Sequence, residues 1–200
     1  DVANAIEALG CWLAIHKLKA GQDPRLRGHR KLANVTAADL RYRNVRRAGF
    51  YVSQPMRMAT VQALPALGLV ENGSTRFSAY VCTRAGTELV EAFAEAYRPW
   101  NSSLEAVLAG WIQGDETIRA GDTLCRALAP NIPLPAEAIG QLHERLLRGG
   151  DAESQEDTAR RRDLLAWAEA RRIGAVDDLD WGRRPQAISS SSHWHDLEAG

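Results

Sequence analysis

Residues 63–86, ALPALGLVENGSTRFSAYVCTRAG, constrain the fold more than any other part of the chain. They have the pattern of a helix end, a short strand, a polar turn and a second strand that leads into another helix. The turn sequence NGST between two apolar stretches is a strong hairpin signal. Alternate apolar residues from Phe77 to Val81 predict a half-buried second strand. Thr83 is placed to cap the helix that follows the hairpin.

A first helix is predicted upstream of this hairpin, over residues 37–47. Thr36 and Asp39 have the spacing of a capping box, with the shorter acid in place of glutamate. Leu40 and Val45 are expected to face the core. Four arginines lie on the same helix, so its other sides are expected to be strongly basic.

A second helix is predicted over residues 54–67. Ser53 is a good N-cap, and Pro55 lies in the first turn, where its missing N–H group is tolerated. Pro65 cannot bond to the carbonyl of Val61, so a kink or a tightened last turn is expected there.

Helical spacing dominates the rest of the chain, which is therefore predicted to be mainly α with one small β-hairpin. The further predicted helices cover 3–19, 103–113, 118–128, 136–148 and 153–172. The predicted division is a first domain at 1–98, an acidic helical domain or bundle at 99–174, and an irregular tail or linker at 175–200. The chain begins with Asp rather than Met, and the sequence leaves open whether it is a fragment of a longer protein.

The neutral total charge hides two halves of opposite sign. Residues 1–70 contain eleven Lys and Arg against four acids, whereas residues 71–200 contain fourteen against twenty-one. This asymmetry indicates that the first half meets a polyanion, or that the two halves meet each other.

Composition indicates a folded protein of the cytoplasm. No apolar run approaches the roughly 18 residues that a membrane-spanning helix needs, and no membrane partner is expected. Cys11, Cys82 and Cys125 are odd in number and lie in apolar patterns, so they are expected to be core residues in a reducing compartment. No cofactor is expected.

The stretch from Thr36 to Phe93 resembles a winged helix-turn-helix domain. The resemblance is carried by the helix pair around RRAGFYVSQP, by LPALGLVE, by the turn NGST and by YVCTRAGTELVEAF. The last of these is similar to the strand-Thr-x-x-Gly-x-x-Leu ending of many bacterial winged-helix regulators. The resemblance implies a DNA-binding protein, either a transcriptional regulator or the DNA-engaging subunit of a larger bacterial assembly.

In that family the second helix of the pair usually enters the major groove of double-stranded DNA, and the wing usually touches the backbone or minor groove. The resemblance therefore implies groove-facing side chains at Ser53, Gln54, Arg57, Met58 and Gln62, and wing contacts from Ser74, Thr75 and Arg76. Arginine can pair with guanine and glutamine with adenine through two hydrogen bonds each. Phosphate contacts are expected from Arg25, Arg27, Arg30, Lys31, Arg41, Arg43, Arg46 and Arg47.

Two other functions stay open from the residues alone. Met58 and Val61 put apolar groups on the outer face of the second helix, which suits a winged helix that binds another protein. The chain could also be the non-catalytic part of a longer enzyme. The acidic helical half is expected to form a homodimer or to pack in a larger assembly.

Enzyme and metal signals are weak, and neither a catalytic nor a metal site is predicted. His143 opens the sequence HERLL, which lacks the second histidine of a zinc-protease helix. The sequence HWHD at 193–196 has two histidines in a polar terminal stretch, a pattern that seldom binds a metal.

Overall fold

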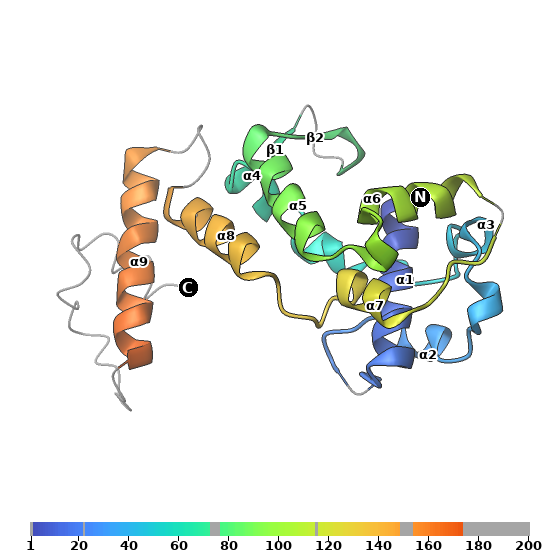
Figure 1. The fold of residues 1–200 in the computed structure, drawn as a ribbon. Coiled ribbons are helices and arrows are strands. Elements are labelled where there is room, and N and C mark those ends of the chain that lie inside the picture. The colour runs from blue at the N-terminus through green and yellow to red at the C-terminus, as the bar shows by residue number, and fades with distance from the viewer. Residues whose placement is uncertain (1, 22, 73–76, 115, 149–153, 174–200) are drawn as a thin grey trace.

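The computed structural model describes residues 2–21, 23–72, 77–114, 116–148 and 154–173. These residues form nine α-helices, four short 3-10 helices and one two-stranded antiparallel sheet (Figure 1), which confirms the mainly α prediction. The α-helices are α1 Val2–Lys17, α2 His29–Leu32, α3 Tyr42–Val45, α4 Ala63–Ala66, α5 Arg84–Ala96, α6 Leu104–Gln113, α7 Asp122–Leu128, α8 Ala136–Arg148 and α9 Gln155–Ile173. The 3-10 helices are η1 Ala37–Asp39, η2 Met56–Ala59, η3 Phe77–Ala79 and η4 Pro99–Asn101.

Helix α1 is the centre of the core. The sequence predicts a helix over 3–19, and α1 is buried continuously from Ala8 to Ile15. Small residues on several sides let neighbouring segments approach it closely, and α2, α3 and α7 all pack against it. At Gly10 an added Cβ would lie 2.3 Å from the carbonyl oxygen of Leu128, so this position admits no side chain while α7 stays in place.

The core continues across the boundary predicted at 98/99. Helices α6 and α7 belong to the same hydrophobic cluster as α1. The indole N–H of Trp111 on α6 donates to the carbonyl of Leu40 at 2.8 Å, and that of Trp12 on α1 donates to Val35, also at 2.8 Å. Helices α6 and α7 therefore complete the core of the N-terminal part.

Helices α8 and α9 lie on the other side of the molecule (Figure 1). Helix α8 packs on α5, and α9 packs on α8. The Nε–H group of Arg145 on α8 donates to the carbonyl of Leu67, just after α4, at 2.7 Å. This bond joins α8 to the segment that leads into the hairpin.

The hairpin forms where the sequence predicts it. Strands β1 Val70–Asn72 and β2 Tyr80–Cys82 pair antiparallel, with Val70 opposite Cys82. Val81 is nonetheless 65% exposed and Phe77, in η3, is 38% exposed, so the expected half-buried alternation is wrong. A hairpin of two three-residue strands cannot bury one of its own faces, so side chains on that face stay exposed unless another element packs on them.

The Thr-x-x-Gly sequence after the hairpin has a physical role in this fold. The Thr83 side chain accepts a hydrogen bond from the N–H of Gly86 and so caps α5, as predicted. A Cβ at Gly86 would lie 2.0 Å from the carbonyl oxygen of Leu69, so glycine lets α5 start directly against the strand.

The helix predicted over 37–47 is wrong as a continuous element. The Thr36–Asp39 capping box forms, but it opens only the single turn of η1, and α3 covers four residues. Arg41 between them is extended (φ −74°, ψ 136°) and its backbone bridges to Thr117. Pairing with a distant segment therefore interrupts the helix.

The helix predicted over 54–67 is likewise replaced by two short turns, η2 and α4. Ser53 is not the N-cap, because η2 starts after Pro55. Pro65 lies in the first turn of α4, where its missing N–H group has no partner to lose. The short helix α4 thus begins at Ala63, two residues before Pro65, and no long helix passes through this proline. The pair of long helices expected from the winged-helix resemblance is therefore not formed, whereas the hairpin and α5 are.

Candidate functional site

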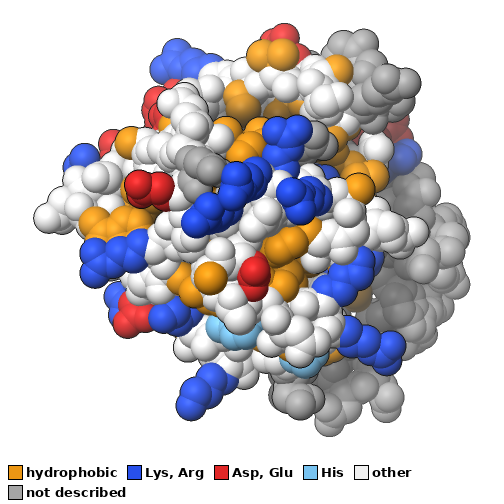
Figure 2. Space-filling view, turned by 90° about the vertical axis from the view of Figure 1, so that its right-hand side faces the viewer, with side chains coloured by type: hydrophobic (Ala, Val, Ile, Leu, Met, Phe, Trp, Pro, Cys, Tyr) orange, Lys and Arg blue, Asp and Glu red, His pale blue; other side chains and the backbone are white. Residues whose placement is uncertain are grey.

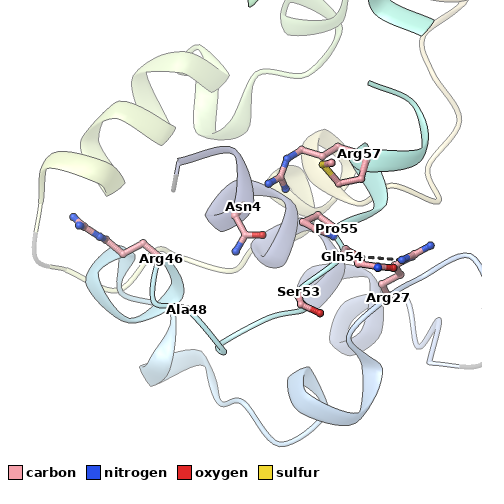
Figure 3. A pocket seen from close by; sticks show the side chains of 9 residues that line it. Asn4, Arg27, Arg46, Ala48, Ser53, Gln54, Pro55 and Arg57 are labelled. Atoms are coloured by element: carbon pink, nitrogen blue, oxygen red, sulfur yellow. Dashed lines mark hydrogen bonds between the residues drawn. The ribbon is translucent and has the colours of Figure 1, made fainter. Parts of the chain in front are cut away.

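A pocket of about 640 Å³ lies where the loop before α2, the end of α3 and the segment 53–58 meet α1. Three arginines line it, with polar groups between them (Figure 3). In the close-up, Arg46 lies on one side of the pocket and Arg27 and Arg57 on the other, with Asn4 between them. We call this the arginine pocket; its lining is Asn4, Arg27, Arg46, Ala48, Ser53, Gln54, Pro55, Arg57 and Met58.

The arginine pocket brings together residues for which two different roles were predicted. Ser53, Gln54, Arg57 and Met58 were predicted to read bases from a helix, and they line the pocket from an irregular segment and η2. Arg27 and Arg46 were predicted to contact phosphates, and they line the same pocket. Gln62 is exposed but is not part of the pocket lining. The wing residues Ser74, Thr75 and Arg76 lie outside the described residues.

Glu7 on α1 fixes the position of Arg57. Its Oε2 atom accepts from the Arg57 NH1 group at 3.0 Å, and the exposed fractions of the two side chains are 13% and 26%. The same carboxylate accepts from the backbone N–H groups of Met56 and Arg57. These bonds hold η2 against α1. Glu7 was not among the predicted site residues, although an acid inside the apolar run of residues 5–15 is the signal that marks it.

A buried polar chain continues from Glu7 into the core. The Tyr51 hydroxyl donates to Glu7 Oε1 at 3.0 Å, and the Cys11 sulfur lies 3.3 Å from that hydroxyl. Burial is the main cause that raises the pKa of Tyr51, and its contacts with Cys11 and Glu7 raise the pKa further. Burial likewise raises the pKa of the Cys11 thiol. Both groups therefore stay protonated at neutral pH and act as packing and hydrogen-bonding groups.

Arg57 also connects the arginine pocket to the hairpin. Its guanidinium carbon lies 5.8 Å from the centre of the Phe77 ring, a cation–π distance. The Nε atom is buried and has no hydrogen-bond partner among the described residues. Glu7 and Phe77 thus hold this guanidinium from two directions, and the hairpin lies beside the pocket.

The remaining predicted cations extend from the pocket over the surface that carries α2 and α3. Figure 2 shows this side of the molecule, with Lys and Arg side chains clustered near its centre. Arg46 lies over the Tyr42 ring at 5.8 Å, and Lys31 donates to the carbonyl of Gly49 at 2.8 Å. Arg41 is only half-exposed. We call the exposed set the cationic face: Arg27, Arg30, Lys31, Arg43, Arg46 and Arg47.

Three of the four acids of residues 1–70 have hydrogen-bond or ion-pair partners within the same half of the chain. Glu7 binds Arg57, and Asp23 forms an ion pair with Arg25 at 2.7 Å. Hydrogen bonds from Arg25 lower the pKa of Asp23 to about 2. Hydrogen bonds from Thr36 lower the pKa of Asp39. Asp1 lies outside the described residues. Among the described acids of residues 1–70, Glu7 and Asp23 therefore form ion pairs with arginines that are not part of the cationic face.

A smaller pocket of about 410 Å³ lies next to the arginine pocket, and Ala48 lines both. Asn34, Asn44 and Arg47 line it together with the ring of Phe50. This pocket extends the hollowed surface from α3 toward η1.

Exposed apolar groups occur beside the arginine pocket. Met58 is 55% exposed, as its predicted outward position requires, and Phe77 and Val81 of the hairpin region are exposed too. Val61 is 5% exposed, so its predicted position on the outer face is wrong. Cys82 is exposed, which corrects the prediction that all three cysteines lie in the core.

The described residues contain no group of three or more His, Cys, Asp or Glu side chains placed to hold a metal ion. The histidines of HWHD lie outside the described residues. Among the described helices, none has both the length and the apolar character needed to cross a bilayer. No family model, curated protein or solved structure matches the chain.

Proposed function

We propose that the protein binds double-stranded DNA through the cationic face and the arginine pocket, as a regulator or as the DNA-engaging subunit of a larger assembly. The observation that carries this proposal is the meeting of Arg27, Arg46 and Arg57 with Ser53 and Gln54 in one pocket beside a β-hairpin. These residues come from separate segments, and the tertiary structure gathers them on one surface.

The chemistry of this surface suits a nucleic acid. Exposed arginines and a lysine neutralise backbone phosphates, and release of the condensed counterions favours association. Ser53 and Gln54 add uncharged hydrogen-bonding groups at the centre, where phosphate or base contacts are made. Arg57 is held by Glu7 and Phe77, so it contributes a fixed positive group rather than a mobile one.

A duplex-binding titration tests the proposal. Fluorescence anisotropy of a labelled duplex should report binding by the wild-type protein that weakens steeply between about 50 mM and about 200 mM salt. A triple variant with Arg30, Arg46 and Arg47 changed to Gln should bind more weakly. The slope of log affinity against log salt should shrink by about 0.9 for each phosphate contact removed.

The matched control removes the same charge elsewhere. Arg84, Arg126 and Arg148 are exposed on α5, α7 and α8, and a triple variant with these changed to Gln should keep wild-type affinity and slope. If the wild-type protein binds no duplex at low salt, the proposal is wrong. Equal losses in the two triple variants would also count against it, because they would indicate a general charge effect.

Docking of a partner protein is a second candidate function. It is favoured by the exposed apolar side chains of Met58 in η2, Phe77 in η3 and Val81 in β2. This function predicts a stable complex with a specific protein that the double variant Phe77→Ser, Val81→Thr weakens. It also predicts that the duplex titration is flat in both the wild type and the Arg30, Arg46, Arg47 variant. A salt-sensitive duplex complex that the hairpin variant leaves unchanged would rule against it.

A further inference from the structure

The smaller pocket beside the arginine pocket has a lining that phosphate contacts do not explain. We call it the Phe50 pocket, after the ring that lines it, and its polar side chains are those of Asn34, Asp39, Asn44 and Arg47. The Asp39 carboxylate repels a phosphate, because the two groups carry charges of the same sign. An uncharged planar group that donates N–H hydrogen bonds fits this lining better than a phosphate does.

We propose that the Phe50 pocket binds an unpaired nucleobase of the bound DNA. The inference deepens the proposed DNA-binding function and rests on it. In this arrangement the cationic face contacts backbone phosphates, which position the nucleic acid, and the Phe50 pocket contacts the face and edge of one base. A base that is already unpaired enters such a pocket without the cost of opening a base pair.

Phe50 supplies the stacking surface. Its side chain is half-buried and packs against the hydrophobic core while it also lines the pocket, so the core holds the ring from one side. The ring contacts no other aromatic ring in the part of the chain that the structure describes. Stacking of a base needs one open face of an aromatic ring and no enclosed cavity. Val35 and Ala48 add apolar surface around the ring.

Asp39 supplies a fixed acceptor. Its Oδ2 atom accepts from the backbone N–H of Thr36 at 2.9 Å and from the Thr36 hydroxyl at 2.6 Å. These bonds lower the pKa of Asp39, so the carboxylate is ionised at neutral pH. Among the described residues no donor is bonded to Oδ1. The Oδ1 atom is therefore left to accept from the N–H groups on the edge of a base.

The two asparagines add groups that both donate and accept. Asn34 is exposed, and its amide has no hydrogen-bond partner among the described residues. Asn44 donates from Nδ2 to the carbonyl of Asp39 at 3.4 Å, which leaves its Oδ1 atom and one N–H for a ligand. Base edges carry donors next to acceptors, and an asparagine amide pairs with adenine through two hydrogen bonds. The polar lining therefore suits a base edge.

The Phe50 pocket is continuous with the surface proposed to bind DNA. Arg47 belongs to the cationic face and lines the pocket, and Ala48 lines both this pocket and the arginine pocket. A strand that follows the cationic face thus passes beside the Phe50 ring.

The test compares two ligands that have the same phosphates and differ in one base. The full chain is titrated by fluorescence anisotropy with a duplex that carries a single unpaired adenine, and with the same duplex carrying an abasic residue at that position. We expect the duplex with the adenine to bind about tenfold more tightly, a gain of the order that stacking on an aromatic side chain gives. With 2-aminopurine in place of the adenine, binding should quench its fluorescence.

Variants locate the effect in the pocket. Asn34→Ala and Phe50→Leu should each remove most of the preference for the base while the affinity for the abasic duplex is retained. Gln113→Ala on α6, exposed and outside the pocket, is the matched control for Asn34→Ala and should keep the preference. Circular dichroism checks that each variant folds. Because Asn34 is exposed, its variant tests the inference even if Phe50→Leu destabilises the core.

The outcomes separate this inference from the DNA-binding proposal. Salt-sensitive binding of the two duplexes with equal affinity overturns the inference and leaves DNA binding intact. A preference for the base that persists in both Asn34→Ala and Phe50→Leu places the base elsewhere and also overturns it. If the protein binds neither duplex at low salt, the DNA-binding proposal fails together with the inference.

Discussion

Glu7 and Arg57 are 50 residues apart in sequence, and their side chains meet at 3.0 Å between α1 and η2. This pair sets the position of an arginine that lines the candidate site. The same carboxylate also fixes the start of η2, since it accepts from the backbone N–H groups of Met56 and Arg57.

Glu7→Gln should destabilise the protein. The amide keeps the shape of the side chain but loses the charge that strengthens the bonds from Arg57 and Tyr51, and the free energy of unfolding should fall by about 1–3 kcal/mol. Urea unfolding followed by circular dichroism measures this. Glu105→Gln, an exposed acid in the first turn of α6, is the control and should change stability by less than about 0.5 kcal/mol. Equal unfolding midpoints for the two variants would show that the Glu7 contacts contribute nothing.

Gly10→Ala and Gly110→Ala should have opposite effects, although both glycines are helical. A Cβ at Gly10 would meet the Leu128 carbonyl oxygen at 2.3 Å, so α1 and α7 must move apart at a cost of about 1–3 kcal/mol. A Cβ at Gly110 meets nothing within 4 Å, and alanine there should add about 0.5–1 kcal/mol of stability. Thermal unfolding measures both. A stable Gly10→Ala protein would contradict the packing of α7 on α1.

The three cysteines should react at different rates with a thiol reagent. Cys82 on β2 is exposed and should be labelled in the folded protein. Cys11 and Cys125 are buried, and burial raises the pKa of both thiols, so little thiolate is present for attack. They should react only after unfolding. Mass spectrometry of labelled peptides identifies each site, and rapid labelling of Cys11 in native buffer would contradict the buried polar chain.

Tyr51 should remain protonated well above the usual tyrosine pKa of about 10. Burial disfavours the phenolate, and Cys11 and Glu7 raise the pKa further. Because the folded pKa is raised, this group's contribution to stability is complete below about pH 10 and is lost as pH rises toward the folded value. The tyrosinate absorbance of folded wild type and of Tyr51→Phe should therefore titrate with equal amplitude just above pH 10. A smaller amplitude in Tyr51→Phe would show that Tyr51 ionises in the folded state.

Local signals predicted several elements well. Thr83 caps α5 through its hydroxyl oxygen, as predicted, and such a bond depends only on residues three positions apart. Helix α8 has the predicted bounds, since its apolar spacing and the prolines before it are written in consecutive residues. The hairpin follows from its turn sequence for the same reason.

Where predictions from local sequence failed, contacts with residues far away in the sequence determined the structure. The helical segment expected from residue 54 begins only at Met56, where Glu7 binds the N–H groups at the start of η2, and no pattern within 54–67 contains that carboxylate. Val61 is buried and Val81 is exposed because burial depends on which segments arrive to cover a side chain. Trp111 likewise finds its acceptor at Leu40, across the predicted domain boundary.

The candidate site was likewise predicted only in part from the sequence. Its residue types were evident from the sequence, since the arginines, Ser53 and Gln54 lie in one basic stretch before the hairpin. Their assembly into one pocket was not, because Asn4 and Glu7 come from α1 and the Phe77 contact comes from beyond the turn. By itself the sequence determined the mainly α class, the capped helices and the hairpin, all of which depend on short-range bonds and spacing. Only the tertiary structure decided how the basic residues are placed, because packing around α1 brings together side chains that no local pattern relates.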